Sequence, residues 1–393
     1  MRHRELDGIR GVACLIVLFD HLIISILSSR LNEFPGAWRL SQWLVGGVDL
    51  FFVLSGFLIG GILLDHKRAT NYFRVFWIRR IGRIMPVYYL LFASFCVVLL
   101  IRPWIDAPWL DQFLLKNPMP VWTYAVFLQN FAQSIDGGDG GARWVASTWS
   151  LAIEEQFYLL LPLLVFTLNR RRLVVLALLC VPVAALVRGY TWQATGSMFT
   201  GYFLLPGRMD ALMCGLLAAL ALRHAPTFAV CRRYRLVLDV AALGVFVMLN
   251  SSLVGGSTNS GSFVIMASDF TFRSVLFAYL ILRVFLVPET SIYRRFLSGR
   301  ALVFFGTISY ALYMYHPAIN GLLFGIIYGG VPVLGSFGEA MVVALVIAVS
   351  IGLAWLSTRY FEMPIRRLAG RVAYRETRPE LDEFALGSAN ARL

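Results

Sequence analysis

Long apolar runs recur along this chain and leave it few folds to adopt. A helix needs about 20 apolar residues to span a bilayer, and ten runs of that order are present. Of the 393 residues, 59% are hydrophobic and only 15% are charged, which is too apolar for a soluble protein of this length. We therefore predict an all-α, polytopic membrane protein. The runs lie at 9–29, 43–64, 84–102, 148–168, 172–189, 202–222, 235–253, 263–287, 301–328 and 338–358.

Arginine is concentrated between these runs, and its distribution predicts a topology. The positive-inside rule places short basic loops in the cytoplasm. If the ten runs cross and the shorter apolar stretch at 121–131 does not, every basic segment lies on the cytoplasmic side together with both termini. We expect a bundle of about ten transmembrane helices, plus one re-entrant or interfacial helix at 121–131, in the bacterial inner membrane. The basic segments are 66–83, 169–172, 223–235, 294–300 and the region from Arg359.

Charge and cysteine usage exclude two classes of function. The net charge is +13, but the basic residues lie in short, scattered loops, so we expect no nucleic-acid partner. The five cysteines show no CxxC and no metal-ligand spacing, so we expect no metal site.

We predict one membrane domain over 1–367 and a polar, disordered cytoplasmic tail over 368–393. Any chemistry must then belong to the helical bundle.

The first apolar run carries Arg10 and His21, residue types that are costly at bilayer depth. On an α-helix their spacing is about 20° away from three full turns and about 16 Å of rise, so they share one face. Burial and a nearby cation favour a neutral imidazole, which can serve as a general base. The alternative is that Arg10 reaches the interface and His21 makes one interhelical hydrogen bond. Asp20 points about 100° away from His21 and is not its expected partner.

Three arginines, Arg79, Arg80 and Arg83, precede the third run. Guanidinium groups at a helix N-terminus suit phosphates, although anchoring at the cytoplasmic surface explains them equally well. In the second run, Ser55 and Gly56 are small residues that favour close helix packing, which is the reading we prefer for this motif alone.

Two carboxylates, Glu154 and Glu155, lie inside an apolar run, where they have no packing role. Ser147, Ser150, Glu154 and Tyr158 recur at helical spacing and predict one polar stripe.

Later runs hold Asp210, Tyr310 and His316. His316 precedes Pro317, where a helix kinks and can present a polar side chain to a cavity. Asp269 and Arg273, four residues apart, predict a structural ion pair.

Together these motifs resemble the acyltransferase 3 family of membrane acyltransferases. The similarity covers about residues 4–367, and the ordered set is far more specific than any single motif. The matching pieces are "LDGIRG" with Arg10 ten residues before His21, "FFVLSGFLI", "RRIGRIMPVYY", "WSLAIEEQFYLLLP", "RMDALMCGLLAAL", "FGTISYALYMYHP" and "FEMP".

The resemblance implies transfer of an acyl group, commonly acetyl, from cytoplasmic acyl-CoA to a hydroxyl of a sugar or related acceptor. It implies no permanently bound cofactor, and it marks Arg10 and His21 as the residues most tied to activity. It also implies a stand-alone type, without the extracytoplasmic hydrolase-like domain of some members. A surface glycan, a lipid-linked sugar and a macrolide-like acceptor all stay open.

On this basis we assign three groups of residues. His21 is the predicted general base or acyl relay, with Arg10 and Glu154 as further catalytic residues. We assign Arg79, Arg80, Arg83 and Ser55 to acyl-CoA, and Tyr158, Tyr310, His316 and Asp210 to acceptor binding or support. The main competitor is a transporter or flippase, because intramembrane carboxylates and histidines also serve proton relays. The chain shows no two-half repeat of the kind common in transporters.

Overall fold

The computed structural model describes residues 3–27, 44–116, 119–136, 141–254 and 263–376. Every predicted apolar run forms a helix there, because a helix satisfies its own backbone hydrogen bonds in lipid. The long helices are α1 (Arg4–Phe19), α4 (Gly46–Asp65), α5 (Tyr72–Ile101), α8 (Thr148–Thr167), α9 (Arg170–Thr195), α11 (Leu205–Leu222), α13 (Arg235–Val254), α14 (Phe263–Leu286), α16 (Arg300–Tyr328) and α17 (Phe337–Ser357).

Two of these helices continue through a π-helical turn. Helix α1 passes into η1 (Asp20–Ile24) and α2 (Ser25–Leu27), and α17 passes into η6 (Thr358–Glu362) and α18 (Met363–Gly370). Such turns are frequent at functional sites. Of the described residues, seven helical stretches are long and apolar enough to cross a membrane. The all-α membrane fold is confirmed, and the number of ten crossings stays a prediction.

The stretch at 121–131 does not form a spanning helix. It contains α6 (Val121–Ala125) and the start of α7 (Gln129–Ile135), separated by Phe127 with a positive φ of 59°. Each helix is far shorter than a bilayer crossing requires. The other short helices are η3 (Arg102–Trp104), η4 (Leu110–Leu114), η5 (Arg143–Val145), α10 (Met198–Tyr202), α12 (Ala225–Arg233) and α15 (Ile292–Leu297).

Glycines bring the central helices into backbone contact. Helix α4 packs on α11, and a Cβ added to Gly56 would overlap the carbonyl of Leu212. Helix α1 crosses α16, where a Cβ on Gly306 would overlap the carbonyl of Asp7. Close packing at Gly56 is therefore confirmed.

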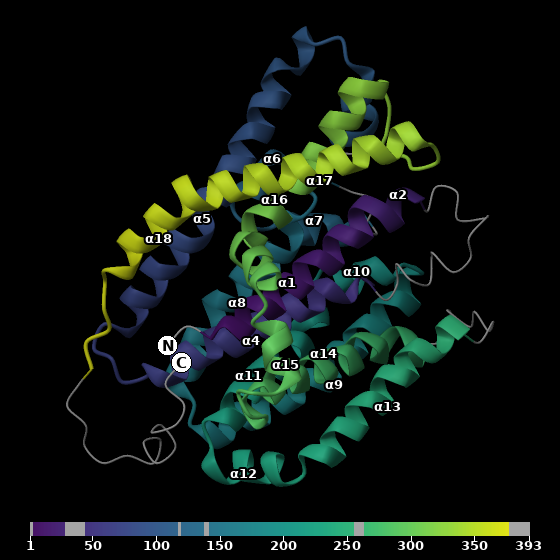
Figure 1. Cartoon of the computed structure of the whole chain (residues 1–393). Helices are drawn as coiled ribbons and strands as arrows, with labels where there is room; N and C mark the ends of the chain where they lie inside the picture. Colours follow the sequence, from purple (N-terminus) through teal and green to yellow (C-terminus); the bar gives the residue numbers. More distant parts are fainter. Residues whose placement is uncertain (1–2, 28–43, 117–118, 137–140, 255–262, 377–393) are drawn as a thin grey trace.

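Figure 1 shows the arrangement of the outer helices. Helix α17 runs obliquely past α16, on which it packs, and α13 lies at the outer edge against α14.

The described part of the C-terminal segment lies against the α4–α5 loop. The Thr70 N–H donates to the Arg375 carbonyl at 3.0 Å, and the Asn71 amide donates to the Ala373 carbonyl at 2.9 Å. These contacts hold residues 373–375 close to the start of α5. This end of the bundle carries basic residues from several helices, and we call it the basic end. The rest of the predicted tail, 377–393, lies outside the described residues.

Candidate functional site

Three cavities follow one another through the bundle. We call them the basic-end, central and histidine cavities, with volumes of about 270, 120 and 560 Å³. The first two share Arg10, Arg83, Ser309 and Tyr310 as lining residues, and the last two share Val48 and Tyr313. Because neighbouring cavities share walls, they form one series. Acidic and basic residues lining the basic-end cavity are Asp7, Arg10, Arg83, Glu362, Arg366 and Arg367.

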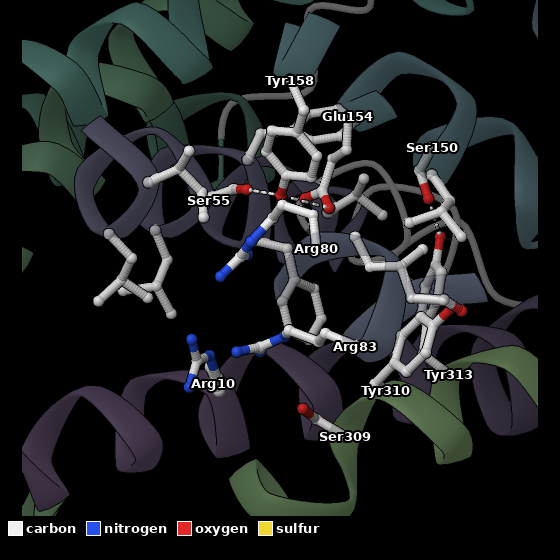
Figure 2. A pocket seen from close by; sticks show the side chains of 18 of the residues that line it. Arg10, Ser55, Arg80, Arg83, Ser150, Glu154, Tyr158, Ser309, Tyr310 and Tyr313 are labelled. Atoms are coloured by element: carbon white, nitrogen blue, oxygen red, sulfur yellow. Dashed lines mark hydrogen bonds between the residues drawn. The ribbon is translucent and has the colours of Figure 1, made fainter. Parts of the chain in front are cut away.

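The central cavity has a cationic side and a hydroxyl-rich side. Figure 2 shows the guanidinium groups of Arg10, Arg80 and Arg83 directed toward one open space. Arg10 is oriented by Asp7, one turn away, at 3.0 Å. Three positive groups around one narrow space suit a polyanionic ligand.

Beside Arg80, whose guanidinium lies 5.9 Å from the Tyr158 ring, three side chains of the central cavity form a hydrogen-bonded chain. The Tyr158 hydroxyl donates to Glu154 Oε2 at 3.0 Å, and Ser55 Oγ is hydrogen-bonded to the same hydroxyl. Since the one proton of Tyr158 goes to the carboxylate, Ser55 is the donor to Tyr158. The chain joins α4 to α8 (Figure 2), and Glu154 thereby orients two hydroxyl groups.

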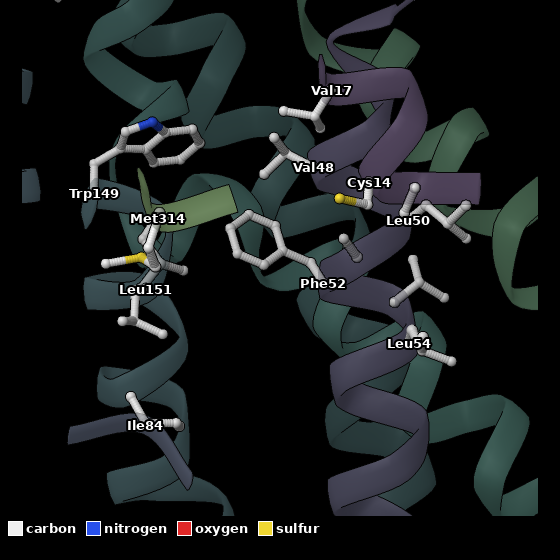
Figure 3. Packing of buried hydrophobic residues seen from close by; sticks show 14 of the residues in the cluster. Cys14, Val17, Val48, Leu50, Phe52, Leu54, Ile84, Trp149, Leu151 and Met314 are labelled. Atoms are coloured by element: carbon white, nitrogen blue, oxygen red, sulfur yellow. The ribbon is translucent and has the colours of Figure 1, made fainter. Parts of the chain in front are cut away.

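The remaining wall of the central cavity is apolar. Figure 3 shows Phe52 of α4 directed toward Leu151 of α8 and Met314 of α16. These three side chains and Leu54 line the cavity. A narrow cavity with cations near one end and apolar walls beyond fits an extended chain that carries an anionic head.

Two histidines from distant parts of the chain meet at the histidine cavity. His21 Nδ1 of η1 lies 2.9 Å from His316 Nε2 of α16, and the rings stack with centroids 5.1 Å apart. Both residues line the cavity. Helix α16 continues through Pro317, directly after His316.

The partners of this pair determine where its protons lie when both rings are neutral. His316 Nδ1 is 3.1 Å from the Leu312 carbonyl, which can only accept, so His316 carries its proton on Nδ1. Its Nε2 is then an acceptor, and His21 must donate from Nδ1. His21 Nε2 is left with a lone pair and can take a proton. The α16 backbone thus fixes the tautomer of His21 through His316.

The histidine cavity also contains residues that the motif reading did not single out. Asn320, one turn after His316, has a buried side-chain oxygen with no hydrogen-bond partner among the described residues. Trp149 lines the same cavity and packs on Tyr202, with centroids 4.8 Å apart. A wide cavity with an aromatic wall and available polar atoms suits a ring-shaped polar ligand.

Two predicted site residues lie away from these cavities. Arg79 donates to the Val372 carbonyl at 2.9 and 3.2 Å and lies over the Tyr374 ring, so it anchors the C-terminal segment. Asp210 accepts hydrogen bonds from Arg188 at 2.8 Å and Thr271 at 2.6 Å, and its side chain is fully buried. The other predicted residues line the central or the histidine cavity.

Several cavity residues were missed in the sequence. Arg366 and Arg367 line the basic-end cavity, and Arg366 pairs with Glu362 at 2.9 Å. The "FEMP" motif just before them could have drawn attention to these two arginines. They lie in a basic segment, however, and the positive-inside rule already accounts for its charge. Tyr313, in the "FGTISYALYMYHP" motif, lines both inner cavities, and its hydroxyl lies 2.8 Å from Ser150 Oγ.

The chain is similar to known membrane acyltransferases. It is 29% identical over 390 residues to the O-acetyltransferase OatA of Staphylococcus aureus, in the sequences of strains COL and MRSA252. The alignment covers 92% of this chain and 57% of each relative, so the chain spans little more than half the length of those proteins. No solved structure matches it. The family model described as an acyltransferase domain matches residues 3–359, and the chain therefore belongs to the acyltransferase 3 family.

Proposed function

We propose that this protein is a membrane O-acetyltransferase that moves an acetyl group from acyl-CoA to a hydroxyl of a carbohydrate acceptor. The observation that carries the proposal is the His21–His316 pair. This pair lines the histidine cavity, which adjoins the arginine-lined central cavity. Family membership supports the reaction class, and the relatives' name, O-acetyltransferase, supports the group transferred.

The acyl-CoA donor fits the basic-end cavity and the central cavity together. The phosphates of CoA would bind Arg83, Arg366 and Arg367, and the pantetheine arm would extend along the apolar wall of the central cavity. Arg10 lines both cavities and would steady negative charge between them. We propose that this end faces the cytoplasm, with both termini there, in a bacterial inner membrane.

The acceptor fits the histidine cavity. Its hydroxyl proton passes to His21 Nε2 as the oxygen attacks the thioester carbonyl, and the C–S bond then breaks. The proton held by His21 goes to the departing CoA thiolate, which leaves as the thiol. His316 positions His21 by accepting from Nδ1, and it stabilises the imidazolium that forms. Asn320 and Trp149 would bind the sugar ring.

The proposal is tested with His21→Ala, using His224→Asn as a matched control. His224 lies at the start of α12, lines none of the three cavities, and caps that helix by accepting from the Thr227 N–H, as Asn also can. Cells carrying the wild type or the control should show alkali-labile acetate on surface carbohydrate, whereas His21→Ala should lose it.

Purified wild type and His21→Ala should both be stabilised against heat by CoA, because the donor cavities do not include His21. Acetylation that persists in His21→Ala would remove the proposed base. Absence of any CoA effect on the wild type would instead favour a transporter, for which the connected cavities would be the conduit.

A further inference from the structure

A fourth cavity lies at the basic end between α16 and α17. It borders the basic-end cavity at Thr307 and Met363, but none of its charged lining residues lines that cavity. It has a volume of about 300 Å³ and is lined by Arg4, Arg300 and Arg359 together with an apolar surface that includes Phe304 and Trp355. Arg4 and Arg300 are the first residues of α1 and α16, and Arg359 lies in η6, so the three cations come from three different helical segments.

Some arginines at this end of the molecule are already paired with carboxylates. Arg223, Arg283 and Arg294 each pair with a carboxylate within 3.0 Å. Within the part of the chain that the structure describes, Arg4, Arg300 and Arg359 have no carboxylate partner. Arg4 makes a 3.4 Å bond to the Ser298 carbonyl, and Arg359 lies over the rings of Trp355 and Tyr360. Their positive charge is available to an anion.

A buried polar group provides a second observation. Thr358 lines this cavity, is 2% exposed, and its hydroxyl has no hydrogen-bond partner among the described residues. A buried hydroxyl without a partner costs free energy. A ligand oxygen in the cavity would satisfy it.

The apolar part of the cavity indicates what kind of anion binds. Phe304 and Trp355 are 38% and 40% exposed, on the flank of helices that we place in the bilayer. A phosphate beside three arginines with hydrocarbon beside two aromatic rings is the chemistry of a phospholipid. A free phosphate would make no use of the apolar surface.

We propose that this cavity binds an anionic phospholipid, with its phosphate held by Arg4, Arg300, Arg359 and the Thr358 hydroxyl and its acyl chains along Phe304 and Trp355. The bound lipid fills the crevice between α16 and α17 and holds α17 against the bundle. This inference does not depend on the acetyl-transfer proposal.

The test compares purified, delipidated full-length protein with the double variant Arg300→Gln/Arg359→Gln. The control is Arg232→Gln/Arg295→Gln, which removes two exposed arginines outside the cavity. Phosphatidylglycerol and phosphatidylcholine are titrated while thermal unfolding and retained lipid, by native mass spectrometry, are measured. Each cation near an anionic lipid contributes about fivefold in affinity, so the double variant should bind phosphatidylglycerol roughly 30-fold more weakly.

Thr358→Val, which conserves volume, should weaken phosphatidylglycerol binding about tenfold. The control variant should bind it like the wild type. Equal stabilisation by phosphatidylcholine, unchanged binding by the cavity variants, an equal effect of glycerol phosphate, or displacement of the lipid by CoA would each overturn the proposal.

Discussion

Two sets of buried charged residues lie in this bundle, and they differ in what lies beside them. Between α4, α9, α11 and α14, Arg208 pairs with Asp49, Arg188 with Asp210, and Arg273 with Asp269 at 2.6 Å. The predicted Asp269–Arg273 pair is thereby confirmed. Arg208 and its partner are fully buried and line none of the cavities described above. The second set, around Arg10 and Arg83, lines cavities large enough for a ligand.

The difference separates charged residues that join helices from charged residues that, on the function proposed above, bind a ligand. In the first set each cation already has its anion, and the ring of Tyr202 lies 4.5 Å from the Arg208 guanidinium. In the second, three guanidinium groups face one space. Exposure alone does not distinguish the sets. In the second set Arg10 pairs with Asp7 at 3.0 Å, but it also shares an open cavity with Arg80 and Arg83, whereas Arg208 of the first set lines no cavity described above. Variants in the first set should therefore change stability, and variants in the second should change substrate kinetics.

Arg208→Gln should have the largest effect. It leaves Asp49 buried without its partner, and breaking a buried ion pair costs about 3–5 kcal/mol. We expect a large fall in the free energy of unfolding and little folded protein after purification. A partner variant, Asp49→Asn/Arg208→Gln, should recover part of the loss because no charge is left uncompensated. Normal stability of Arg208→Gln would erase the distinction between the two sets.

His316→Gln should lower the rate of acetyl transfer strongly while leaving the fold intact. A variant that loses the group orienting a functional histidine typically loses about 10- to 100-fold in function. We expect kcat to fall by that order, with the donor KM unchanged and a changed pH–rate profile, because His21 is no longer held in one tautomer. If only stability changed, His316 would be a packing residue.

Val48→Phe tests whether the central and histidine cavities work in series. Val48 lines both, and a larger side chain should narrow the passage between them. We expect kcat to fall about tenfold, while the stabilisation by CoA measured by thermal unfolding stays as in the wild type. Val53→Phe, on the same helix but outside both cavities, controls for overpacking, which should reduce stability instead.

Arg367→Gln should produce the smallest effect, confined to the donor. Loss of one charge-assisted hydrogen bond to a phosphate corresponds to about a tenfold rise in the KM for acyl-CoA. The acceptor KM and kcat should not change. Arg371→Gln, just after α18 and outside the basic-end cavity, is the matched control. An equal effect of both variants would mean that the general positive potential of this end, rather than the cavity, attracts the donor.

The sequence was sufficient for the fold and for the family, and insufficient for the pairing of side chains. Apolar runs predict membrane helices because the bilayer imposes one length and one hydrogen-bonding solution. Arg79, Arg80 and Arg83 were indistinguishable as a basic cluster, yet only Arg80 and Arg83 line the central cavity, because Arg79 points to the C-terminal segment. Helical rotation predicted that Asp20 is not the partner of His21, and His21 contacts His316 instead, although Asp20 lines the same cavity. It could not reveal that the partner of His21 comes from α16, since tertiary contacts leave no mark on local periodicity.

The His21–His316 contact joins residues that are 295 positions apart, and this separation matters for biosynthesis. Helix α1 and η1 leave the ribosome early, but His21 of η1 has no fixed tautomer until α16 has inserted and packed on it. On the proposed mechanism, a stalled or truncated chain that ends before α16 would therefore not react with acyl-CoA, even with Arg10 and Arg83 in place. The enzyme would become reactive only after nearly all of its helices had assembled.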